Sequence, residues 1–223
     1  MKAMILAAGF GTRLKPLTDN IPKALIKYQN KTLIQYQIEK LKNAGIDKII
    51  INAHHFSDKI ESYLNENDFG VKEIKIIKEK EILGTGGGIL NAREFFLGEE
   101  YFLVINVDVF TNLDYKKIIT FHEANPAFST IAVQKRQSKK YLEFDSDMKF
   151  MGRENKNSDK NNLYAFNGLH IISGEIFKKN LPVIYCDIIE IYLQLINNKE
   201  IIHGFDAGNS YCKDLGKIEN LRD

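Results

Sequence analysis

The sequence predicts an α/β fold, a three-layer sandwich in which a mostly parallel, twisted sheet carries helices on both faces. Two observations predict it: short apolar segments alternate with segments of helical periodicity in the first half, and the connections between them are short. Strand–helix alternation of this kind is typical of parallel sheets that are covered on both faces. A third observation, a turn-rich segment between short strands of the second half, adds a small β-hairpin insertion.

The first half is expected to alternate strands and helices in a regular order. The helix predicted over 33–44 has apolar residues at a spacing near 3.6, and Gly45 is placed to end it. The predicted strands are 2–7, 48–51, 73–77 and 101–107, and the other predicted helices are 58–64 and 88–96. Ligands of such sheets bind beyond the carboxyl ends of the strands, so a functional site is expected there.

The second half is expected to hold shorter strands and one more helix. The predicted strands are 130–134, 142–144, 149–151 and 164–172, and the predicted helix is 188–196. Residues 145–147, Asp-Ser-Asp, are typical of a hairpin turn, and the polar segment 155–162 is typical of a solvated loop. The sequence contains neither an internal repeat nor a Pro/Gly/Ser-rich linker, so one domain spanning residues 1–223 is expected.

Composition excludes several classes of protein. Of 223 residues, 44% are hydrophobic and 27% charged, which is close to the average of globular proteins. Lys and Arg number 31 against 29 for Asp and Glu, so the formal charge of +2 predicts no nucleic-acid partner. No apolar run approaches the ~18 residues of a membrane span. Two cysteines, Cys186 and Cys212, cannot make a disulfide framework, so a reduced, cytoplasmic protein is expected.

The strongest local signal is the segment Leu-Ala-Ala-Gly-Phe-Gly-Thr-Arg at 6–13, followed by Pro22 and Lys23. Glycines at the end of a buried strand let backbone N–H groups approach an anion closely. Arg13 and Lys23 add two cations near the same place, and a triphosphate suits that arrangement. The alternative is an ordinary strand-to-loop turn with a surface arginine. The segment is neither a dinucleotide fingerprint nor a P-loop, because both need other residues at fixed spacings.

A second glycine-rich segment, Leu-Gly-Thr-Gly-Gly-Gly at 83–88, is expected to form a loop just before a helix. Its glycines permit close backbone approach, and the N-terminus of the following helix favours negative or electron-rich groups. The alternative is a flexible loop without function. Glu79 and Glu81 precede this segment and are each interpreted as a solvated charge. His54 and His55 follow a predicted strand and are candidates for the mouth of the site or for ordinary surface histidines.

Asp108 stands at the carboxyl end of an apolar strand, where a ligand is expected. A carboxylate near a buried strand end needs a partner. Mg²⁺ bridging triphosphate oxygens is suitable, because hard cations take oxygen ligands and retain some waters. A capping aspartate is the alternative. Asp214, near the C-terminus, has no distinctive pattern around it when it is considered by itself.

The spaced pattern Leu-Ala-Ala-Gly-x-Gly-Thr-Arg-Leu-x-Pro-Leu-Thr, with the later Pro-Lys, resembles the sugar-1-phosphate nucleotidylyltransferase family. The Leu-x-Thr-Gly-Gly-Gly form is similar to bacterial N-acetylmuramate 1-phosphate uridylyltransferases and to some mannose- and heptose-1-phosphate guanylyltransferases, and of these the chain is most like the uridylyltransferases. The resemblance extends through most of the chain and is more diffuse after Val109. It implies the Rossmann-like form of the three-layer sandwich. It also implies that 1–110 is the nucleotide-binding half and 111–223 the sugar-binding half.

The resemblance also assigns site residues. It implies that Arg13 and Lys23 are catalytic, and that Asp108 and Asp214 hold Mg²⁺. The implied nucleotide-binding residues are Leu6, Ala7, Ala8, Gly9, Gly11, Thr12, Thr85, Gly86 and Gly87, and the implied sugar-binding residues are Asn106, Asn167 and Gly168. The sequence departs from the family pattern at several positions. Val107 replaces a common glycine, Ile184 lies close to the place of an expected glutamate, Tyr211 or Cys212 stands near the aromatic position, and Lys217 replaces a threonine after Asp214.

The function that these residues imply is transfer of a nucleoside monophosphate from an NTP to a sugar 1-phosphate, with release of pyrophosphate. UTP and N-acetylmuramate 1-phosphate, or a related hexose 1-phosphate, are the expected substrates. Guanylyl transfer to mannose or heptose 1-phosphate is the alternative, and cytidylyl transfer of the phosphocholine type is a further one. A nucleotide-binding regulator that has lost catalysis is the alternative from a different class. A monomer or a homodimer is expected.

Overall fold

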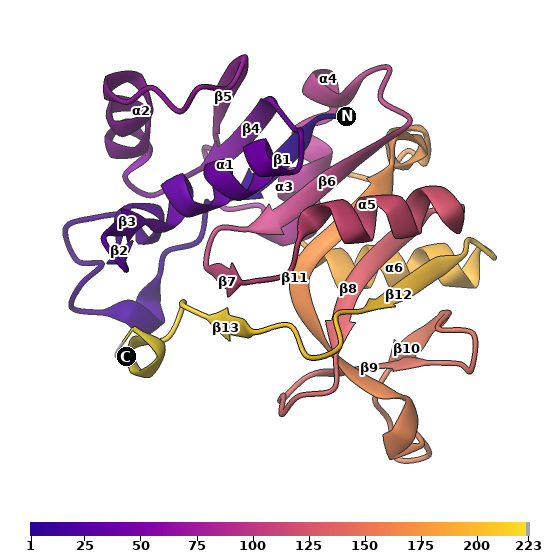
Figure 1. Cartoon of the computed structure of the whole chain (residues 1–223). Helices are drawn as coiled ribbons and strands as arrows, with labels where there is room; N and C mark the ends of the chain where they lie inside the picture. The colour runs from indigo at the N-terminus through magenta and orange to yellow at the C-terminus, as the bar shows by residue number, and fades with distance from the viewer. Residues whose placement is uncertain (222–223) are drawn as a thin grey trace.

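A nine-stranded sheet runs through the centre of the protein in the computed structural model, which describes residues 1–221 (Figure 1). Its strands are β1 (Ala3–Leu6), β4 (Lys48–Ala53), β5 (Glu73–Lys78), β6 (Tyr101–Asn106), β8 (Ser129–Gln134), β9 (Tyr141–Phe144), β10 (Phe150–Arg153), β11 (Leu163–Ser173) and β12 (Ile202–Asp206). The order is β10-β9-β11-β6-β1-β4-β5, with β8 paired to both β11 and β12. Every strand predicted from the sequence is present, with ends shifted by one or two residues.

The direction of the strands brings most of their carboxyl ends to one edge of this sheet. Strands β4, β5, β1 and β6 pair in parallel, and β11 is antiparallel to β6, β8 and β9. Because β6 and β8 both oppose β11, they run the same way as each other, and β12 is parallel to β8. Only β10 and β11 of the large sheet run in the opposite direction.

Helices cover both faces of the sheet, which confirms the predicted three-layer sandwich. They are α1 (Leu33–Asn43), α2 (Ser57–Glu66), α3 (Gly84–Asn91), α4 (Arg93–Phe96), α5 (Tyr115–Ala124) and α6 (Ile188–Asn197). Apolar side chains of α1, α2 and α5 pack in one core cluster, and those of α3, α4 and α6 in the other. Figure 1 shows α1 and α5 in front of the sheet and α3 and α6 behind it. Neighbouring side chains of strand β1 belong to different core clusters: Ile5 packs in the first and Met4 in the second.

Two short two-stranded ribbons lie outside the large sheet. In one, β13 (Cys212–Asp214) pairs with β7 (Val109–Thr111), and in the other β2 (Lys27–Tyr28) pairs with β3 (Lys31–Thr32). The predicted hairpin is present as the antiparallel pair β9–β10. Within residues 1–221, no helix is both long enough and apolar enough to cross a bilayer.

The second glycine-rich segment is not the loop that the sequence predicts, because helix α3 begins at Gly84 rather than at Gly88. Tertiary packing explains why so poor a helix-forming sequence is helical here. A Cβ on Gly87 would stand 2.1 Å from the carbonyl oxygen of Ile184, and one on Gly86 would stand 2.7 Å from Sγ of Cys186. The glycines therefore allow the segment before α6 to lie directly against the first turns of α3.

This packing predicts that Gly87→Ala destabilises the protein, although alanine is the better helix former by about 1 kcal/mol. The added methyl group would collide with the carbonyl of Ile184, and overpacking costs about 1–3 kcal/mol. Urea denaturation measures the change, with Asn91→Ala as the matched control, because Asn91 lies exposed on the same helix. A Gly87→Ala protein that is as stable as wild type would contradict this account of the glycine segment.

Candidate active site

The glycine segment that follows β1 lies between the ends of two neighbouring strands. In the parallel registers of the sheet, Leu6 is aligned with both Asn52 on β4 and Asn106 on β6. The buried side chain of Asn52 accepts a hydrogen bond from the backbone N–H of Ala7 at 2.9 Å. This contact fixes the direction in which the chain leaves β1, so the predicted residues Leu6, Ala7 and Ala8 are buried at the carboxyl edge.

Gly11 provides the turn that returns the chain toward Lys23. Its φ is +67°, a left-handed conformation that favours glycine, and a Cβ there would meet the side chain of Thr18 at 2.9 Å. The hydroxyl of Thr18 donates to the carbonyl of Gly11. Gly9 on the same segment is exposed, and the Lys23 ammonium would lie 3.8 Å from a Cβ placed on it. The turn thus places a cation directly beside the glycine backbone.

Lys23 and Asp108 form a mostly buried ion pair across the crevice. The Lys23 Nζ lies 2.8 Å from Oδ2 of Asp108, and the two side chains are 14% and 11% exposed. Burial by itself would raise the pKa of Asp108, but the charge and the hydrogen bond of Lys23 outweigh burial and hold that pKa below its usual value. Asp108 is therefore a carboxylate at neutral pH, ready to receive a cation.

A second cation–carboxylate pair, Arg13 with Asp214, lies beside the first at an N–O distance of 3.3 Å. The ribbon β7–β13 places it there, because the backbone N–H of Leu215 donates to the carbonyl of Asp108 at 2.8 Å. Gly216 is the point of convergence. A Cβ there would lie 2.5 Å from Asp108, 2.8 Å from Asp214 and 2.9 Å from Arg13. Four charged groups from distant parts of the chain thus meet in one crevice.

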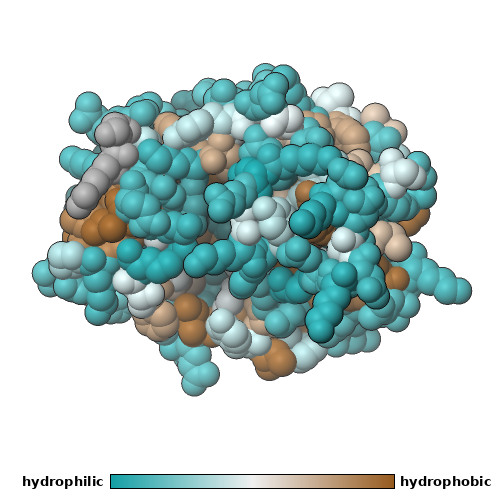
Figure 2. All heavy atoms as spheres, turned by 90° about the horizontal axis from the view of Figure 1, so that it is seen from below, coloured by the Kyte–Doolittle hydropathy of each residue, from teal (hydrophilic) through white to brown (hydrophobic). Residues whose placement is uncertain are grey.

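The crevice opens into two hollows that share Asn106 and Asp108. The first hollow, of about 170 Å³, is also lined by Leu6, Ala8, Gly9, Lys23, Gly84 and Thr85. The second hollow, of about 180 Å³, is also lined by Arg13, Val109, Arg136, Asn167, Gly168 and Asp214. Figure 2 shows the underside of the molecule, where hydrophilic side chains predominate and hydrophobic ones form separate small patches. Such a surface suits polar, charged ligands.

The second hollow contains all three residues predicted to contact a sugar. Gly168 has a φ of +73°, and a Cβ there would lie 2.8 Å from the amide of Asn106, so only glycine fits well. It lies in the irregular part of β11, where the pairing with β8 shifts register between Phe166 and His170. The bulge turns Asn167 toward Arg136, whose Nε donates to Oδ1 of Asn167 at 3.1 Å.

The residues predicted to contact the nucleotide at 85–87 have different surroundings. Thr85 lines the first hollow, and its hydroxyl accepts from the backbone N–H of Ile188 at 2.9 Å. Gly86 and Gly87 are buried against the segment before α6, and the N–H of Gly86 donates to the carbonyl of Cys186. The packing of these two glycines therefore positions helix α3, which forms a wall of the first hollow. Gly84 is the glycine of α3 that lines the hollow itself.

Glu79 is buried, so its interpretation as a solvated charge is wrong. Its carboxylate accepts from the side-chain amide of Asn52 at 2.7 Å and from the backbone N–H of Leu83 at 3.1 Å. Its carbonyl lies 2.9 Å from Nδ1 of His54. Because Asn52 also holds Ala7, this network connects the glycine segment after β1 to the start of α3. The two walls of the first hollow are thus held together by hydrogen bonds.

The donor set of the crevice suits a hard divalent cation. No group of three or more His, Cys, Asp or Glu side chains within residues 1–221 is arranged to hold a metal. Asp108 and Asp214 supply two carboxylates in contact with one glycine. Mg²⁺ usually binds through one or two carboxylates together with waters and substrate phosphates, so this pair fits it.

A buried polar network on α1 and α5 supports Asp108 from behind. The side-chain amide of Gln37, fully buried, donates to the carbonyls of Val107 and Val109, the two neighbours of Asp108. Burial raises the pKa of Tyr115, so its phenol keeps its proton and donates to Oε1 of Gln37 at 2.8 Å. The loop that carries Asp108 is therefore fixed by side chains from the core.

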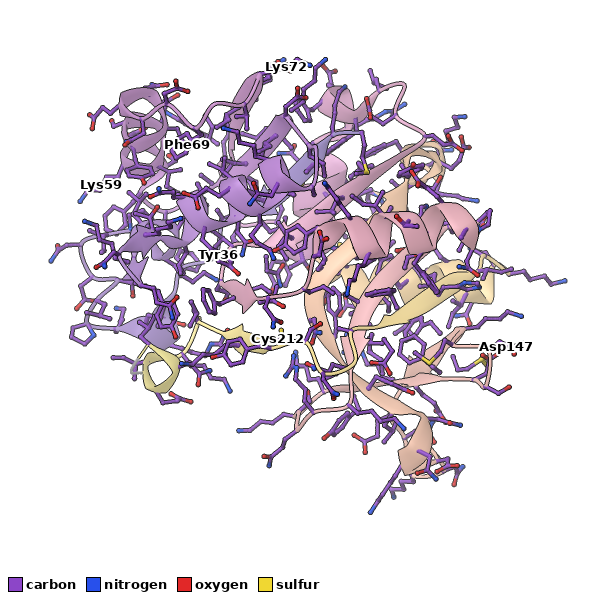
Figure 3. The ribbon with its side chains drawn as sticks, in the orientation of Figure 1. Tyr36, Lys59, Phe69, Lys72, Asp147 and Cys212 are labelled. Atoms are coloured by element: carbon purple, nitrogen blue, oxygen red, sulfur yellow. The ribbon has the colours of Figure 1, made fainter. Side chains whose placement is uncertain are left out.

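The ribbon that carries Asp214 is fixed to the same helix. The hydroxyl of Tyr36 donates to the carbonyl of Thr111, and the backbone N–H of Thr111 donates back to that hydroxyl. Thr111 pairs with Cys212 across the ribbon. Figure 3 labels Tyr36 and Cys212 on either side of β7. Both carboxylate-bearing segments thus depend on α1.

Sequence reasoning missed Asn52, Gln37 and Arg136. Asn52 directly follows the apolar run 49–51 near the carboxyl end of β4. A polar residue at that place is a usable signal, because the carboxyl ends of parallel strands carry sites. Arg136 follows β8 in the same way. Its place at the same edge depends on the direction of β11, which the sequence does not reveal. Gln37 carries no signal, because a glutamine within an amphipathic helix resembles an ordinary surface residue.

The fold and the crevice together define an α/β protein with paired charges at the carboxyl edge of a mostly parallel sheet. The chain belongs to the nucleotidyl transferase family, whose model matches residues 2–223. This membership confirms the predicted resemblance at the level of the family.

Curated relatives carry names that specify a base and a sugar. Mannose-1-phosphate guanylyltransferase catalytic subunit beta of Xenopus tropicalis is 37% identical over 138 residues, covering 60% of this chain and 38% of its own length. Mannose-1-phosphate guanylyltransferase 1 of Arabidopsis thaliana is 35% identical over 189 residues, covering 80% of this chain and 52% of its own length. The chain thus corresponds to between 38% and 52% of the length of these relatives.

Solved structures match the whole fold. HddC from Yersinia pseudotuberculosis superposes with a TM-score of 0.81 at 25% identity, covering 98% of this chain and 95% of its own. The same protein complexed with GMP-PN also gives 0.81. A putative glucose-1-phosphate thymidylyltransferase from Bacillus anthracis gives 0.84 at 20% identity, covering 100% of this chain and 92% of its own, and supports the fold alone.

The network behind Asp108 predicts that Gln37→Met lowers the free energy of unfolding by about 1–3 kcal/mol, because the carbonyl of Val109 and the hydroxyl of Tyr115 lose their buried partner. Urea denaturation gives the value. Gln35→Met is the matched control, since Gln35 lies on the same helix in a half-buried position. Equal losses in the two variants would show that the buried amide has no special role.

Proposed function

We propose that this protein transfers a nucleoside monophosphate from an NTP to a sugar 1-phosphate and releases pyrophosphate. The observation that carries the proposal is the convergence of two cation–carboxylate pairs at Gly216. A metal–triphosphate complex carries both kinds of charge: the metal ion is positive and the phosphate oxygens are negative. In its presence the carboxylates of Asp108 and Asp214 have a divalent cation to hold, while Lys23 and Arg13 have phosphate oxygens to bind.

The reaction forms one bond and breaks one. A phosphate oxygen of the sugar 1-phosphate attacks the α-phosphorus of the NTP, and the bond from that phosphorus to the bridging oxygen of the β-phosphate breaks, so pyrophosphate leaves. No general base is needed, because a phosphate monoester with a second pKa of ~6 is already mostly dianionic at neutral pH. The barrier arises from bringing two polyanions together, so positioning and electrostatic stabilisation dominate.

Each hollow is assigned one substrate. The nucleotide occupies the first hollow, with its phosphates near the glycine segment and Lys23, and the sugar 1-phosphate occupies the second. A Mg²⁺ held by Asp108 and Asp214 would neutralise charge on the phosphates between them. The first hollow is lined by residues of 1–110, and the second mainly by residues of 111–223. This division supports the assignment of a nucleotide-binding half and a sugar-binding half.

GTP and mannose 1-phosphate, or a heptose 1-phosphate, are the substrates that we favour within this class. The names of the curated relatives specify guanylyl transfer to mannose 1-phosphate, and HddC is known as a complex with GMP-PN. These comparisons favour the guanylyl alternative over the expected uridylyl transfer to N-acetylmuramate 1-phosphate. The second hollow offers asparagine side chains, a polar lining suited to sugar hydroxyls.

Lys23→Met is predicted to lower kcat by roughly 10²–10³, the loss typical of removing one preorganised charge from the transition state. Lys27→Met is the matched control, since Lys27 lies exposed on β2 four residues further on. Circular dichroism checks that both variants are folded, and pyrophosphate release gives the rate. Near-normal turnover of a folded Lys23→Met protein would overturn the assignment of this residue.

The substrates are tested with the four NTPs, each combined with mannose, heptose, glucose and N-acetylmuramate 1-phosphates, and scored by pyrophosphate release. GTP with mannose or heptose 1-phosphate is expected to give the highest kcat/KM. Preference for UTP with N-acetylmuramate 1-phosphate would reverse the choice within the class. Binding of an NTP without turnover on any acceptor would instead identify a nucleotide-binding regulator.

A further inference from the structure

Arg136 is a charged residue that lines the second hollow. It belongs neither to the glycine segment after β1 nor to the carboxylate pair Asp108 and Asp214, so the proposed function gives it no role so far. It follows the carboxyl end of β8, is half-buried, and lines the hollow together with Arg13 and Asp108. Because β8 runs in the same direction as β6, the carboxyl ends of both strands lie at one edge of the sheet. Arg136 therefore lies at the same edge as Asp108.

The hydrogen bonds of Arg136 are made to neutral acceptors. Its Nε donates to Oδ1 of Asn167 at 3.1 Å, and its Nη2 donates to the carbonyl of Phe166 at 2.9 Å. Arg13 and Lys23 each pair with a carboxylate, whereas Arg136 pairs with no acidic side chain among residues 1–221. A guanidinium has five N–H donors, so three remain for a ligand.

The half-buried guanidinium lines the second hollow with donors that no carboxylate uses, so it can receive an anion there. The fork of an arginine matches phosphate in geometry, and such charge-assisted pairs are among the stronger hydrogen bonds.

The proposed reaction requires a cation of this kind. Its acceptor is a phosphate monoester dianion that must approach an already anionic triphosphate. Arg13 and Lys23 are assigned to the triphosphate, so a further cation that lines the second hollow is available to the attacking phosphate. Arg136 lies on the β8 and β11 side of that hollow, among the residues assigned to the sugar.

We propose that Arg136 binds the 1-phosphate of the acceptor sugar, using the donors that Asn167 and Phe166 leave free. This inference rests on the proposed function, because it specifies how the acceptor of that reaction is held. The contacts to Asn167 and Phe166 hold the guanidinium plane in place. Arg136 therefore also stabilises the bulge of β11, and an experiment must separate that structural part from phosphate binding.

The experiment compares Arg136→Met and Arg136→Lys with wild type in steady-state kinetics, with the NTP and the acceptor varied in turn. Arg136→Met is expected to raise KM for the sugar 1-phosphate by roughly 10- to 100-fold, the loss typical of hydrogen bonds to a charged group, while KM for the NTP stays within twofold. Arg136→Lys is expected to recover part of the loss, because it keeps the charge without the fork.

Lys135→Met is the matched control, because it removes the same charge at the neighbouring exposed position. Its KM values should equal those of wild type. Thermal denaturation reports whether the bulge of β11 has been disturbed, and isothermal titration of the NTP in the absence of acceptor reports on the first hollow. Acceptors with and without a sugar carboxylate distinguish the 1-phosphate from a carboxylate as the anion that Arg136 binds.

The outcomes separate the inference from the function on which it rests. A wild-type protein that uses no sugar 1-phosphate refutes the proposed function itself. An active wild type whose Arg136→Met variant keeps its acceptor KM refutes the inference alone. A variant that raises KM for NTP and acceptor equally also refutes it, since that pattern indicates a general disturbance of the site. A loss confined to acceptors that carry a carboxylate refutes binding of the 1-phosphate.

Discussion

The proposed site depends on one electrostatic constraint: the groups assigned to phosphate and the groups assigned to a divalent cation must lie together before either ligand arrives. Like charges alone in such a crevice would repel, and a buried charge without a partner is costly. The protein meets the constraint by pairing Lys23 with Asp108 and Arg13 with Asp214. In each pair the cation and the carboxylate offset each other's charge in the free protein, and in the proposed reaction each member would bind the opposite charge of a metal–triphosphate complex.

Glycine makes the required close approaches possible at three places. Gly11 adopts the left-handed turn that returns the chain to Lys23, and at Gly216 three charged side chains occupy the space that a Cβ would need. Gly87 lets the segment before α6 contact α3. Where no side chain intervenes, backbone groups come close enough to hold neighbouring segments together. One example is the hydrogen bond from the backbone N–H of Leu215 to the carbonyl of Asp108. The walls of the crevice are therefore set in part by main-chain geometry.

The sequence predicts the parts of this arrangement that are local, and it cannot predict those that depend on long-range pairing. The alternation of strands and helices and the glycine segment after β1 are local patterns, so the fold class and the position of Lys23 follow from them. The three-residue strands β7 and β13 are too short to show periodicity, although they bring Asp214 to Asp108. Burial of Glu79 and Gln37 depends on neighbours far along the chain, and their sequence surroundings suggest solvent exposure instead.

Binding of Mn²⁺ in place of Mg²⁺, followed by electron paramagnetic resonance with a non-hydrolysable GTP analogue present, tests the central claim most directly. If Asp108 and Asp214 hold one cation together, Asp108→Asn and Asp214→Asn should each weaken Mn²⁺ binding at least about tenfold, or about 1.4 kcal/mol. Asp147→Asn, at the exposed tip of the β9–β10 hairpin (Figure 3), should leave it unchanged. Undiminished Mn²⁺ binding after either active-site substitution would contradict the account.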